Sequence, residues 1–191
     1  MRIKVDSQFV IAPYMPNDKG ALIAYLNDED IARNTLRIPY PYTEKDAEEW
    51  LQFADKQFDT LGCYANWAIR DAQDQLIGGI GRLMLYGKDT HMDEIGYWLA
   101  RPYRGQGLMT RVVRAYCNYL FEQERLVRIT ASVFPHNPAS VRVLEKADFQ
   151  REGYLRKHYK KADRYLDGIL FAKIVDWWQR MILLNLKNKY A

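Results

Sequence analysis

The amino-acid sequence predicts an α/β fold built around a mixed, mostly antiparallel sheet. Three segments with strand periodicity, 65–70, 75–85 and 92–99, follow one another across short turns, which is typical of an antiparallel meander. The last of them leads into a glycine loop, a long helix and a further strand at 127–133. A strand–helix–strand unit places its two strands parallel, so both strand arrangements are expected in one sheet.

Composition and charge describe one ordinary globular domain over residues 1–191. The chain is 48% hydrophobic and 27% charged, with no repeat or low-complexity linker. Its formal charge of +4, without a basic block or known motif, does not indicate nucleic acid. No apolar run is long enough for a signal peptide or a membrane span, and the two cysteines form no paired motif. We therefore expect a cytoplasmic protein that binds neither membrane nor nucleic acid directly.

The N-terminal third predicts one short strand and two helices. The strand lies at 8–12, and the polar pair at 17–18 can cap the first helix. Thr43, followed three residues later by Asp46, predicts a capped start for the second helix. Between the two helices lie a polar break at 27–30 and a proline-braced aromatic loop at 38–42.

The C-terminal half alternates helices and strands. Apolar residues from Leu108 to Phe121 recur at helical spacing, which predicts a long helix with one buried face. Asn137 before Pro138 predicts the start of a shorter helix that runs to Ala147. We further expect strands at 149–154 and 165–171 and a last helix at about 173–188, whose apolar face either packs on the core or joins two copies, so that the protein is a monomer or a homodimer.

The loop at 103–107 is the segment most indicative of chemistry. A glycine loop that opens a helix binds anions, because the first helical N–H groups lack partners and the helix dipole is positive there. A Walker A loop is absent, and a Rossmann fingerprint would need glycine at Thr110. The pattern R/Q-x-x-G-x-G/A fits Arg104 and Gly107, with Met109 in the last position.

Together with its surroundings, this loop resembles the GNAT superfamily of N-acetyltransferases. The flanking segments are 93–99 (DEIGYWL), 135–149 (PHNPASVRVLEKADF) and 38–43 (IPYPYT). They are similar to the branch of bacterial ribosomal-protein N-terminal alanine and serine acetyltransferases, over about residues 8–178. The resemblance implies a sheet that is splayed at a cofactor cleft, with helices on both faces. Met109 departs from the usual Gly or Ala but leaves the backbone of the loop intact.

The resemblance implies acetyl-CoA as co-substrate. The backbone amides of the loop would hold its pyrophosphate, and the backbone of the preceding strand would pair with its pantetheine arm. The Asn137 side chain would bind the same arm, although an asparagine before proline also caps a helix. The residues expected to bind acetyl-CoA are Tyr97, Trp98, Leu99, Arg104, Gly105, Gln106, Gly107, Leu108, Met109, Thr110 and Asn137.

Two side chains are predicted to move protons during a direct transfer of the acetyl group. Glu94, in the strand that leads to the loop, is the candidate base, because an amine is mostly protonated at neutral pH and must lose a proton before it attacks. Ser140 is the candidate acid for the departing thiolate. The alternatives are Tyr154 or Tyr159 for the acid and Glu48 or Glu49 for the base.

The acceptor is predicted to be a primary amine, foremost a protein N-terminus. Arg37, Tyr40 and Tyr42 lie in the loop expected to roof the acceptor site, where aromatic rings can line a groove. The three histidines are isolated and show no metal-ligand spacing, so no metal is expected. A small-amine acetyltransferase and a non-catalytic acyl-CoA-binding module remain as alternatives, while an oxidoreductase is disfavoured by the missing third glycine.

Overall fold

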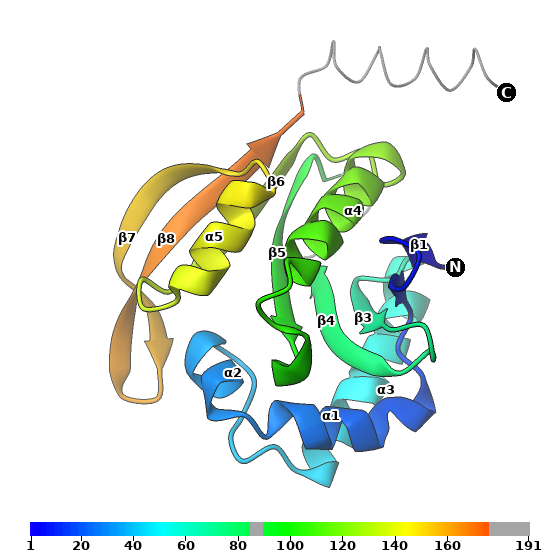
Figure 1. The fold of residues 1–191 in the computed structure, drawn as a ribbon. Coiled ribbons are helices and arrows are strands. Elements are labelled where there is room, and N and C mark those ends of the chain that lie inside the picture. Colours follow the sequence, from blue (N-terminus) through cyan, green and yellow to red (C-terminus); the bar gives the residue numbers. More distant parts are fainter. Residues whose placement is uncertain (85–89, 176–191) are drawn as a thin grey trace, which may run out of the picture.

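The computed structural model describes residues 1–84 and 90–175. They hold an eight-stranded sheet in the order β1-β2-β3-β4-β5-β6-β8-β7 (Figure 1). Neighbouring strands are antiparallel except β5 and β6, so the predicted mixed, mostly antiparallel sheet is confirmed. The strands are β1 (Ile3–Lys4), β2 (Val10–Ala12), β3 (Asn66–Arg70), β4 (Leu76–Arg82), β5 (Met92–Leu99), β6 (Arg128–Val133), β7 (Gln150–Lys161) and β8 (Arg164–Ile174).

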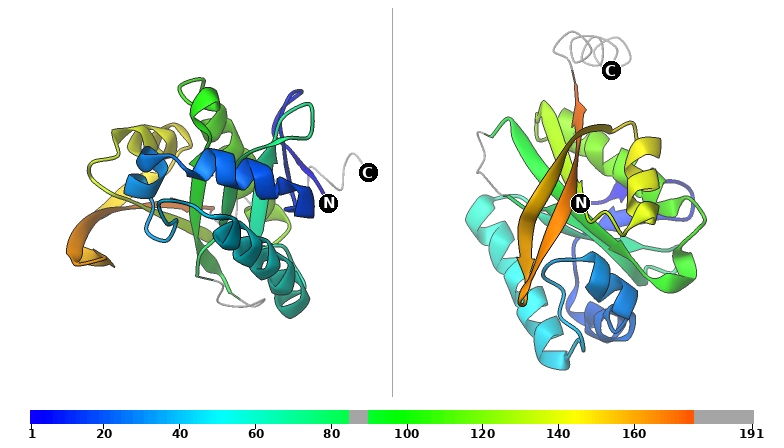
Figure 2. Two further views of the ribbon diagram at one scale, coloured as in Figure 1. Left: turned by 90° about the horizontal axis from the view of Figure 1, so that it is seen from below. Right: turned by 90° about the vertical axis from the view of Figure 1, so that its left-hand side faces the viewer.

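Helices cover both faces of this sheet (Figures 1 and 2). One face carries α4 (Leu108–Glu122) and α5 (Pro138–Lys146). The other carries α1 (Lys19–Leu26) and α3 (Glu44–Leu61), with the short α2 (Glu29–Asn34) between them in sequence. Each face has its own core because strand residues alternate between faces. Trp67 and Ile69 lie in the α4 core, whereas Ala68 between them lies in the α1–α3 core.

The predicted capping and periodicity hold for the two longest helices. At α3 the Thr43 amide donates to the Asp46 carboxylate over 2.7 Å, and the Asp46 amide donates back to the Thr43 hydroxyl over 3.3 Å. Along α4 all residues of the predicted stripe are buried, and Met109 is buried with them; the stripe consists of Leu108, Val112, Val113, Tyr116, Cys117, Leu120 and Phe121.

Glycines in β4 let the strand lie under aromatic side chains. All seven residues of β4 are buried. A Cβ on Gly79 would collide with the Tyr14 hydroxyl and the Trp98 indole nitrogen. Gly79 therefore serves close packing on the α1–α3 side, whereas a Cβ on Gly78 would crowd the Trp98 carbonyl and, on the α4 side, the side chains of Ile69 and Leu99.

A long hairpin, β7 and β8, extends from the sheet toward α2 (Figure 1). The Lys161 ammonium group near its tip donates to the Thr35 carbonyl over 2.6 Å and also to the Ala32 carbonyl. The hairpin is thereby tied to the end of α2, although the two segments are far apart in sequence. This contact brings the hairpin beside the loop that follows α2.

Three predictions about elements need correction. The polar break at 27–30 contains the start of α2, which Asp28 caps by accepting from the Asp30 amide over 2.9 Å. Asp18 does not cap α1 through its side chain; its carboxylate binds the buried Arg70 guanidinium at 2.7 and 2.9 Å, because a buried cation needs a partner. Ile174, expected in the last helix, is in β8, and the rest of that helix beyond residue 175 lies outside the described residues.

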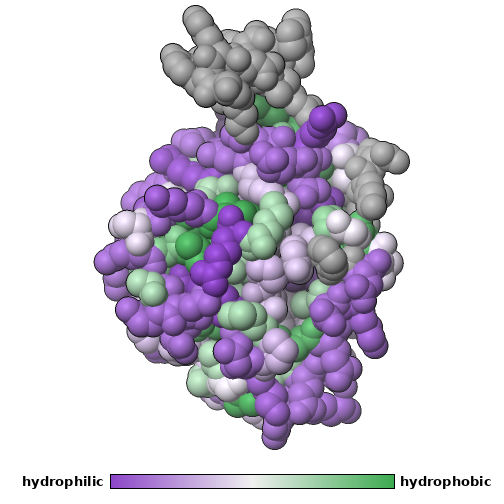
Figure 3. All heavy atoms as spheres, turned by 90° about the vertical axis from the view of Figure 1, so that its right-hand side faces the viewer, coloured by the Kyte–Doolittle hydropathy of each residue, from purple (hydrophilic) through white to green (hydrophobic). Residues whose placement is uncertain are grey.

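The surface is mixed, as the composition predicts. On the face seen in Figure 3, hydrophobic side chains form small patches separated by hydrophilic ones. Across residues 1–84 and 90–175, no helix has the length and apolar character that crossing a bilayer requires.

Candidate functional site

The glycine loop between β5 and α4 has the backbone of an anion cradle. Gly105 and Gly107 both have positive φ, +80° and +71°, a conformation that favours glycine. A Cβ on Gly105 would meet nothing within 4 Å, and one on Gly107 would come no closer than 3.7 Å to Arg111. Both glycines therefore border open space, and their role is conformational.

The amides of this loop are available for a ligand. No described residue accepts a hydrogen bond from the backbone N–H of Gly105, Gln106 or Gly107. The N–H groups of the first turn of α4, which begins at Leu108, have no partner within the helix and stand at the positive end of its dipole. A phosphate-bearing group fits this arrangement of donors.

The Arg104 side chain holds the glycine loop in place through two hydrogen bonds. Its Nε donates to the Leu99 carbonyl over 2.9 Å, and its Nη2 binds the Asp28 carboxylate at 2.9 Å. Arg101 binds the same carboxylate at 2.8 Å. The hydrogen bond from Arg101, with the charge of Arg104 nearby, lowers the pKa of Asp28 below its usual value. Asp28 thus joins the start of α2 to the glycine loop, and its ionised form holds both guanidinium groups.

The sheet opens beside this loop. β5 and β6 pair only from Met92 to Glu94 on one strand and from Arg128 to Thr130 on the other. Beyond Glu94, β5 keeps its partner β4, and β6 keeps its partner β8. The two strands therefore diverge toward the glycine loop and α5, and the splay expected from the resemblance is present.

The backbone groups that face the opening come from alternate residues of β5. The Glu94 carbonyl accepts from Leu83, and the Ala100 amide donates to Ile77, so the even-numbered residues bond toward β4. The polar backbone groups of Tyr97 and Leu99 accordingly face the opening, whereas those of Trp98 face β4. Of the three residues expected to pair with pantetheine, Trp98 has its backbone engaged with β4, and Leu99 has its carbonyl engaged with Arg104, which leaves the Tyr97 backbone and the Leu99 amide.

The N-terminus of α5 stands across the opening. The Asn137 side-chain carbonyl accepts from the Ser140 amide over 3.1 Å and so caps the helix. The Ser140 hydroxyl, in the first turn, lies 2.7 Å from the Tyr97 hydroxyl on β5. The cap predicted for Asn137 is present, and it leaves the Asn137 amide nitrogen free to donate to a ligand.

Glu94 lies on the opposite face of the sheet from Tyr97. Ile95, Tyr97 and Leu99 pack toward α4, while Trp98, on the same face as Glu94, packs on the α1–α3 core. Burial raises the pKa of Tyr159 on β7, a hydrogen bond with Ser132 lowers it in part, and the negative charge of Glu94 also raises it. A carboxylate on one face and a hydroxyl pair on the other therefore flank the opening.

The loop predicted to roof the acceptor site is only partly available. Tyr40 is 51% exposed and Arg37 is exposed, so both can meet an acceptor. Tyr42 is 6% exposed, and its hydroxyl donates to the Asp46 carbonyl over 3.3 Å. Tyr42 packs in the α1–α3 core and holds the loop there, and its contact with an acceptor stays a prediction.

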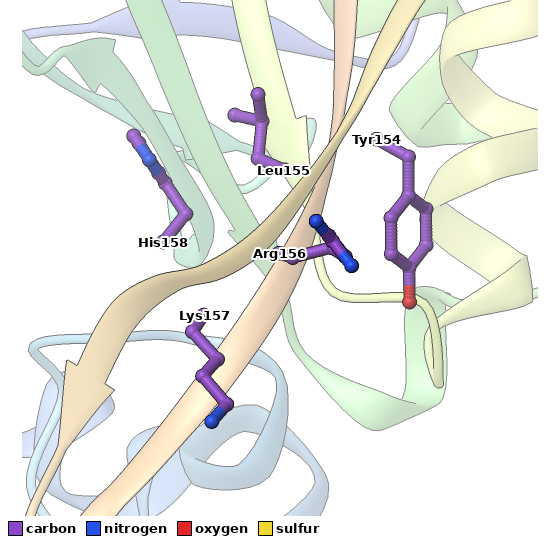
Figure 4. Close-up of a pocket in the computed structure, with 5 residues that line it drawn as sticks. All are labelled: Tyr154, Leu155, Arg156, Lys157 and His158. Carbon is purple, nitrogen blue, oxygen red and sulfur yellow. The ribbon is translucent and has the colours of Figure 1, made fainter.

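The alternative bases and one alternative acid are engaged elsewhere. Glu48 binds Lys19 at 3.2 Å and Glu49 binds Lys45 at 3.6 Å, both in exposed pairs on α3. The Tyr154 hydroxyl donates to the Asp167 carboxylate over 2.7 Å. Tyr154 also lines a shallow surface pocket along β7 with four consecutive residues, Leu155 to His158 (Figure 4).

The histidines do not gather at the site. His136 stacks on Phe134 with ring centres 5.4 Å apart, and His158 packs edge-on against Tyr159 at 4.7 Å. Within the part of the chain that the structure describes, no three His, Cys, Asp or Glu side chains are grouped for a metal ion.

The sequence analysis missed Asp28 and gave Tyr97 only a backbone role. Asp28 lies in a polar run with no motif, and its partners Arg101 and Arg104 are more than 70 residues away. Tyr97 was expected to contribute only its backbone, because a tyrosine on a strand is ordinarily part of the core. A capping residue followed by two acids, Asp28-Glu29-Asp30, was the one local signal for α2.

Comparison with known proteins identifies related chains. A family model described as Acetyltransferase (GNAT) domain matches residues 8–150. A Bacillus licheniformis protein named uncharacterized N-acetyltransferase p20 is 35% identical over 81% of this chain and 86% of its own length. The probable N-acetyltransferase YjcK of Bacillus subtilis is 40% identical, but the match spans 47% of this chain and only 49% of that relative. The ribosomal-protein-serine acetyltransferase of Escherichia coli is 29% identical over 66% of this chain and 76% of its own length.

Solved structures share the fold. An acetyltransferase of the GNAT family from Bacillus anthracis is 25% identical, with a TM-score of 0.79 over 91% of this chain and 98% of that chain. The ribosomal α-N-protein acetyltransferase RimL in complex with coenzyme A is 20% identical, with a TM-score of 0.81 over 92% of this chain and 99% of that chain. The arrangement of sheet, helices and opening is therefore one that other solved proteins have.

Proposed function

The chain belongs to the acetyltransferase (GNAT) domain family, and from this premise we propose that it acetylates the N-terminal amino group of a protein. The relatives named above are N-acetyltransferases, and the chain accordingly uses acetyl-CoA as its acetyl donor. The observation that carries the proposal is the opening between β5 and β6, which has a free glycine cradle at one end and Glu94 and Ser140 on opposite faces.

The cradle and the strand edge would hold the donor. The amides from Gly105 to Thr110 supply hydrogen-bond donors for a pyrophosphate, and Arg104 keeps the loop in place from the side of Leu99. The Tyr97 backbone and the Leu99 amide offer strand-like pairing to the pantetheine arm, which contains two amides. The thioester of acetyl-CoA supplies the activated acetyl group.

The proton acceptor and the hydrogen-bond donor for the reaction lie on the two faces of the sheet. On the face of Glu94, its carboxylate takes the proton that the acceptor amine must lose before its nitrogen attacks. On the face of α5, the Ser140 hydroxyl donates a hydrogen bond to the leaving sulfur, where the positive end of the helix dipole also favours negative charge. The separation of base and acid by the sheet lets the two substrates approach from opposite sides.

A protein N-terminus is favoured over a small amine by two observations. The segment around Arg37 and Tyr40 is exposed and borders the hairpin at Lys161, so the acceptor side has an open surface on which a peptide can lie. Relatives named as ribosomal-protein acetyltransferases act on such an acceptor, and one covers 66% of this chain. A thiol-release screen with peptides of varied N-terminus, polyamines and aminoglycosides tests the choice. Release with the amines alone would overturn it.

Acetyl-CoA is expected to stabilise the folded protein. A ligand at a hundred times its dissociation constant stabilises the folded state by about 2.7 kcal/mol. For a chain of this size the melting temperature should rise by roughly 5–10 °C. Thermal denaturation with acetyl-CoA, and with NAD as the control ligand, measures the effect. A clear shift with NAD and none with acetyl-CoA would contradict the assignment of the glycine loop.

Replacement of Ser140 by alanine should slow catalysis without disturbing the fold. The cap of α5 uses the backbone amide of Ser140, which alanine retains. Loss of a hydrogen bond to a charged atom lowers kcat by about 10- to 100-fold. Because the lost group acts on the leaving sulfur, a higher pH that neutralises the acceptor amine should not restore the rate. A pH–rate profile of wild type and Ser140→Ala decides this, and full recovery at high pH would remove Ser140 from the reaction.

A further inference from the structure

Tyr97 and Ser140 form a hydroxyl pair at the opening of the sheet. Their oxygens are 2.7 Å apart, although the residues lie on different elements and 43 positions apart in sequence. Tyr97 is on β5 beyond the point where this strand leaves β6, and Ser140 is in the first turn of α5. The pair therefore spans the space between the splayed strand and the helix.

Both side chains of this hydroxyl pair are held in place by neighbouring parts of the fold. The Tyr97 ring packs against the α4 core, which fixes the direction of its hydroxyl. Ser140 is fixed by the Asn137 cap on its backbone amide. Burial raises the pKa of Tyr97 well above its ordinary value, so the hydroxyl keeps its proton at neutral pH. A protonated tyrosine can donate to the serine oxygen, and the serine hydrogen is then free to point elsewhere.

We propose that Tyr97 is a positioning residue that directs the hydrogen of Ser140 toward the leaving sulfur atom. The proposal rests on the proposed acetyl transfer and adds to it a residue that acts through Ser140. Donation by Tyr97 occupies a lone pair of the serine oxygen and polarises its O–H bond, which strengthens the next hydrogen bond in the chain.

The bond between the acceptor nitrogen and the acetyl carbon forms, and the bond between that carbon and the sulfur breaks. The ammonium nitrogen gives one proton to Glu94 before it attacks and a second proton to water once its bond to the acetyl carbon has formed, and the sulfur keeps the electron pair of the broken bond. Ser140 donates a hydrogen bond to that sulfur without losing its proton, and Tyr97 holds the serine hydroxyl in this direction. Glu94 returns its proton to water, and the free thiolate is protonated by water.

The tyrosines first considered for the acid are placed less favourably. Tyr154 is 48% exposed, and its hydroxyl is bound to Asp167. Tyr159 packs edge-on against Phe134, with ring centres 5.6 Å apart, on the face of the sheet that carries Glu94. Among the described residues, Tyr97 is the tyrosine whose hydroxyl is hydrogen-bonded to Ser140.

A binding experiment isolates the effect on sulfur. CoA and desulfo-CoA are titrated by calorimetry into wild type and Tyr97→Phe at several pH values. If wild type stabilises the thiolate of CoA, it should bind CoA more tightly than desulfo-CoA. This preference should grow as the pH rises through the pKa of the thiol, which is about 8.5 for an ordinary thiol. Tyr97→Phe should reduce this preference about 3- to 10-fold at high pH and change desulfo-CoA affinity less than twofold. An unchanged preference for CoA in Tyr97→Phe would overturn the proposal.

Steady-state rates supply the second test. Tyr97→Phe should lower kcat about 3- to 10-fold with little change in the KM for acetyl-CoA. Because Tyr97 acts through Ser140, adding Tyr97→Phe to Ser140→Ala should cause no further loss. Tyr116→Phe is the matched control, since Tyr116 is a core tyrosine that is fully buried and whose hydroxyl lies 3.5 Å from the Ala65 carbonyl. Independent, multiplicative losses in the double variant would contradict the positioning role.

The two experiments separate the proposals. Wild type that prefers CoA over desulfo-CoA but acetylates no amine would refute the proposed function while leaving the role of Tyr97 toward sulfur intact. If Tyr97→Phe acetylates amines as fast as wild type and prefers CoA over desulfo-CoA to the same extent as wild type, only the role of Tyr97 is refuted.

Discussion

Glu94→Gln is expected to lower kcat by about 10²–10⁴-fold, the range typical of the loss of a general base. Glutamine has nearly the same shape but cannot take up the proton of the acceptor amine. Glu94 lies on the α1–α3 face of β5 at the last position paired with β6, next to the opening. The contacts proposed for the donor are made by the glycine loop, by Asn137 and by the β5 backbone beyond Glu94, so the affinity for acetyl-CoA should stay within about twofold of wild type.

The pH dependence distinguishes a base from a residue that merely supports the fold. An α-amino group has a pKa of about 8, so the fraction of neutral amine rises up to and beyond this pH. The defect of Glu94→Gln should therefore shrink as pH increases. Glu48→Gln is the matched control, because Glu48 is an exposed glutamate paired with Lys19 on α3. A Glu94→Gln profile identical to wild type, with Glu48→Gln impaired, would move the base to α3.

Gly107→Val is expected to weaken acetyl-CoA binding about 100-fold. Gly107 has a φ of +71° and occupies the N-cap of α4. A β-branched residue in this conformation is strained by about 1–3 kcal/mol, and relief of the strain would turn neighbouring amides away from the phosphate. The nearest side chain to a new Cβ is 3.7 Å away, so no clash forces the protein to unfold.

The control for this variant is Gly20→Ala. Gly20 lies in α1, a Cβ there would meet nothing within 4 Å, and α1 covers the opposite face of the sheet. Gly20→Ala should keep full affinity and a melting temperature equal to or above that of wild type. Calorimetric titration with acetyl-CoA and circular dichroism measure both quantities. Wild-type affinity in a folded Gly107→Val would place the phosphate cradle elsewhere.

Local patterns were enough to predict the elements that define the cofactor side. The stripe from Leu108 to Phe121 is long and strictly helical, and the glycine loop before it carries a recognisable spacing. The parallel pairing of β5 and β6 followed from chain order alone, since one helix connects them. Each of these features is contained within about 40 consecutive residues, which is why sequence spacing could reveal it.

Features that depend on distant partners could not be predicted in this way. Asn17 or Asp18 was expected to cap a helix, yet the Asp18 carboxylate binds Arg70, which is 52 positions away and buried. Asp28 marks a six-residue helix too short to show periodicity, and it binds arginines of the glycine loop. The pairing of Tyr97 with Ser140 depends on how β5 leaves β6, which no local pattern records.

The position of the transferred acetyl group shows whether this chain acetylates the N-terminal amino group of a protein. The full chain is incubated with acetyl-CoA and peptides that begin with a free serine or alanine, with the same peptides blocked at the N-terminus, and with a polyamine. Mass spectrometry locates the acetyl group while thiol release is followed. The account predicts one acetyl group on the α-amine of the free peptides, CoA released in equal amount, and no reaction with the blocked peptides. Transfer to the polyamine but to no peptide, or no transfer at all, would contradict it.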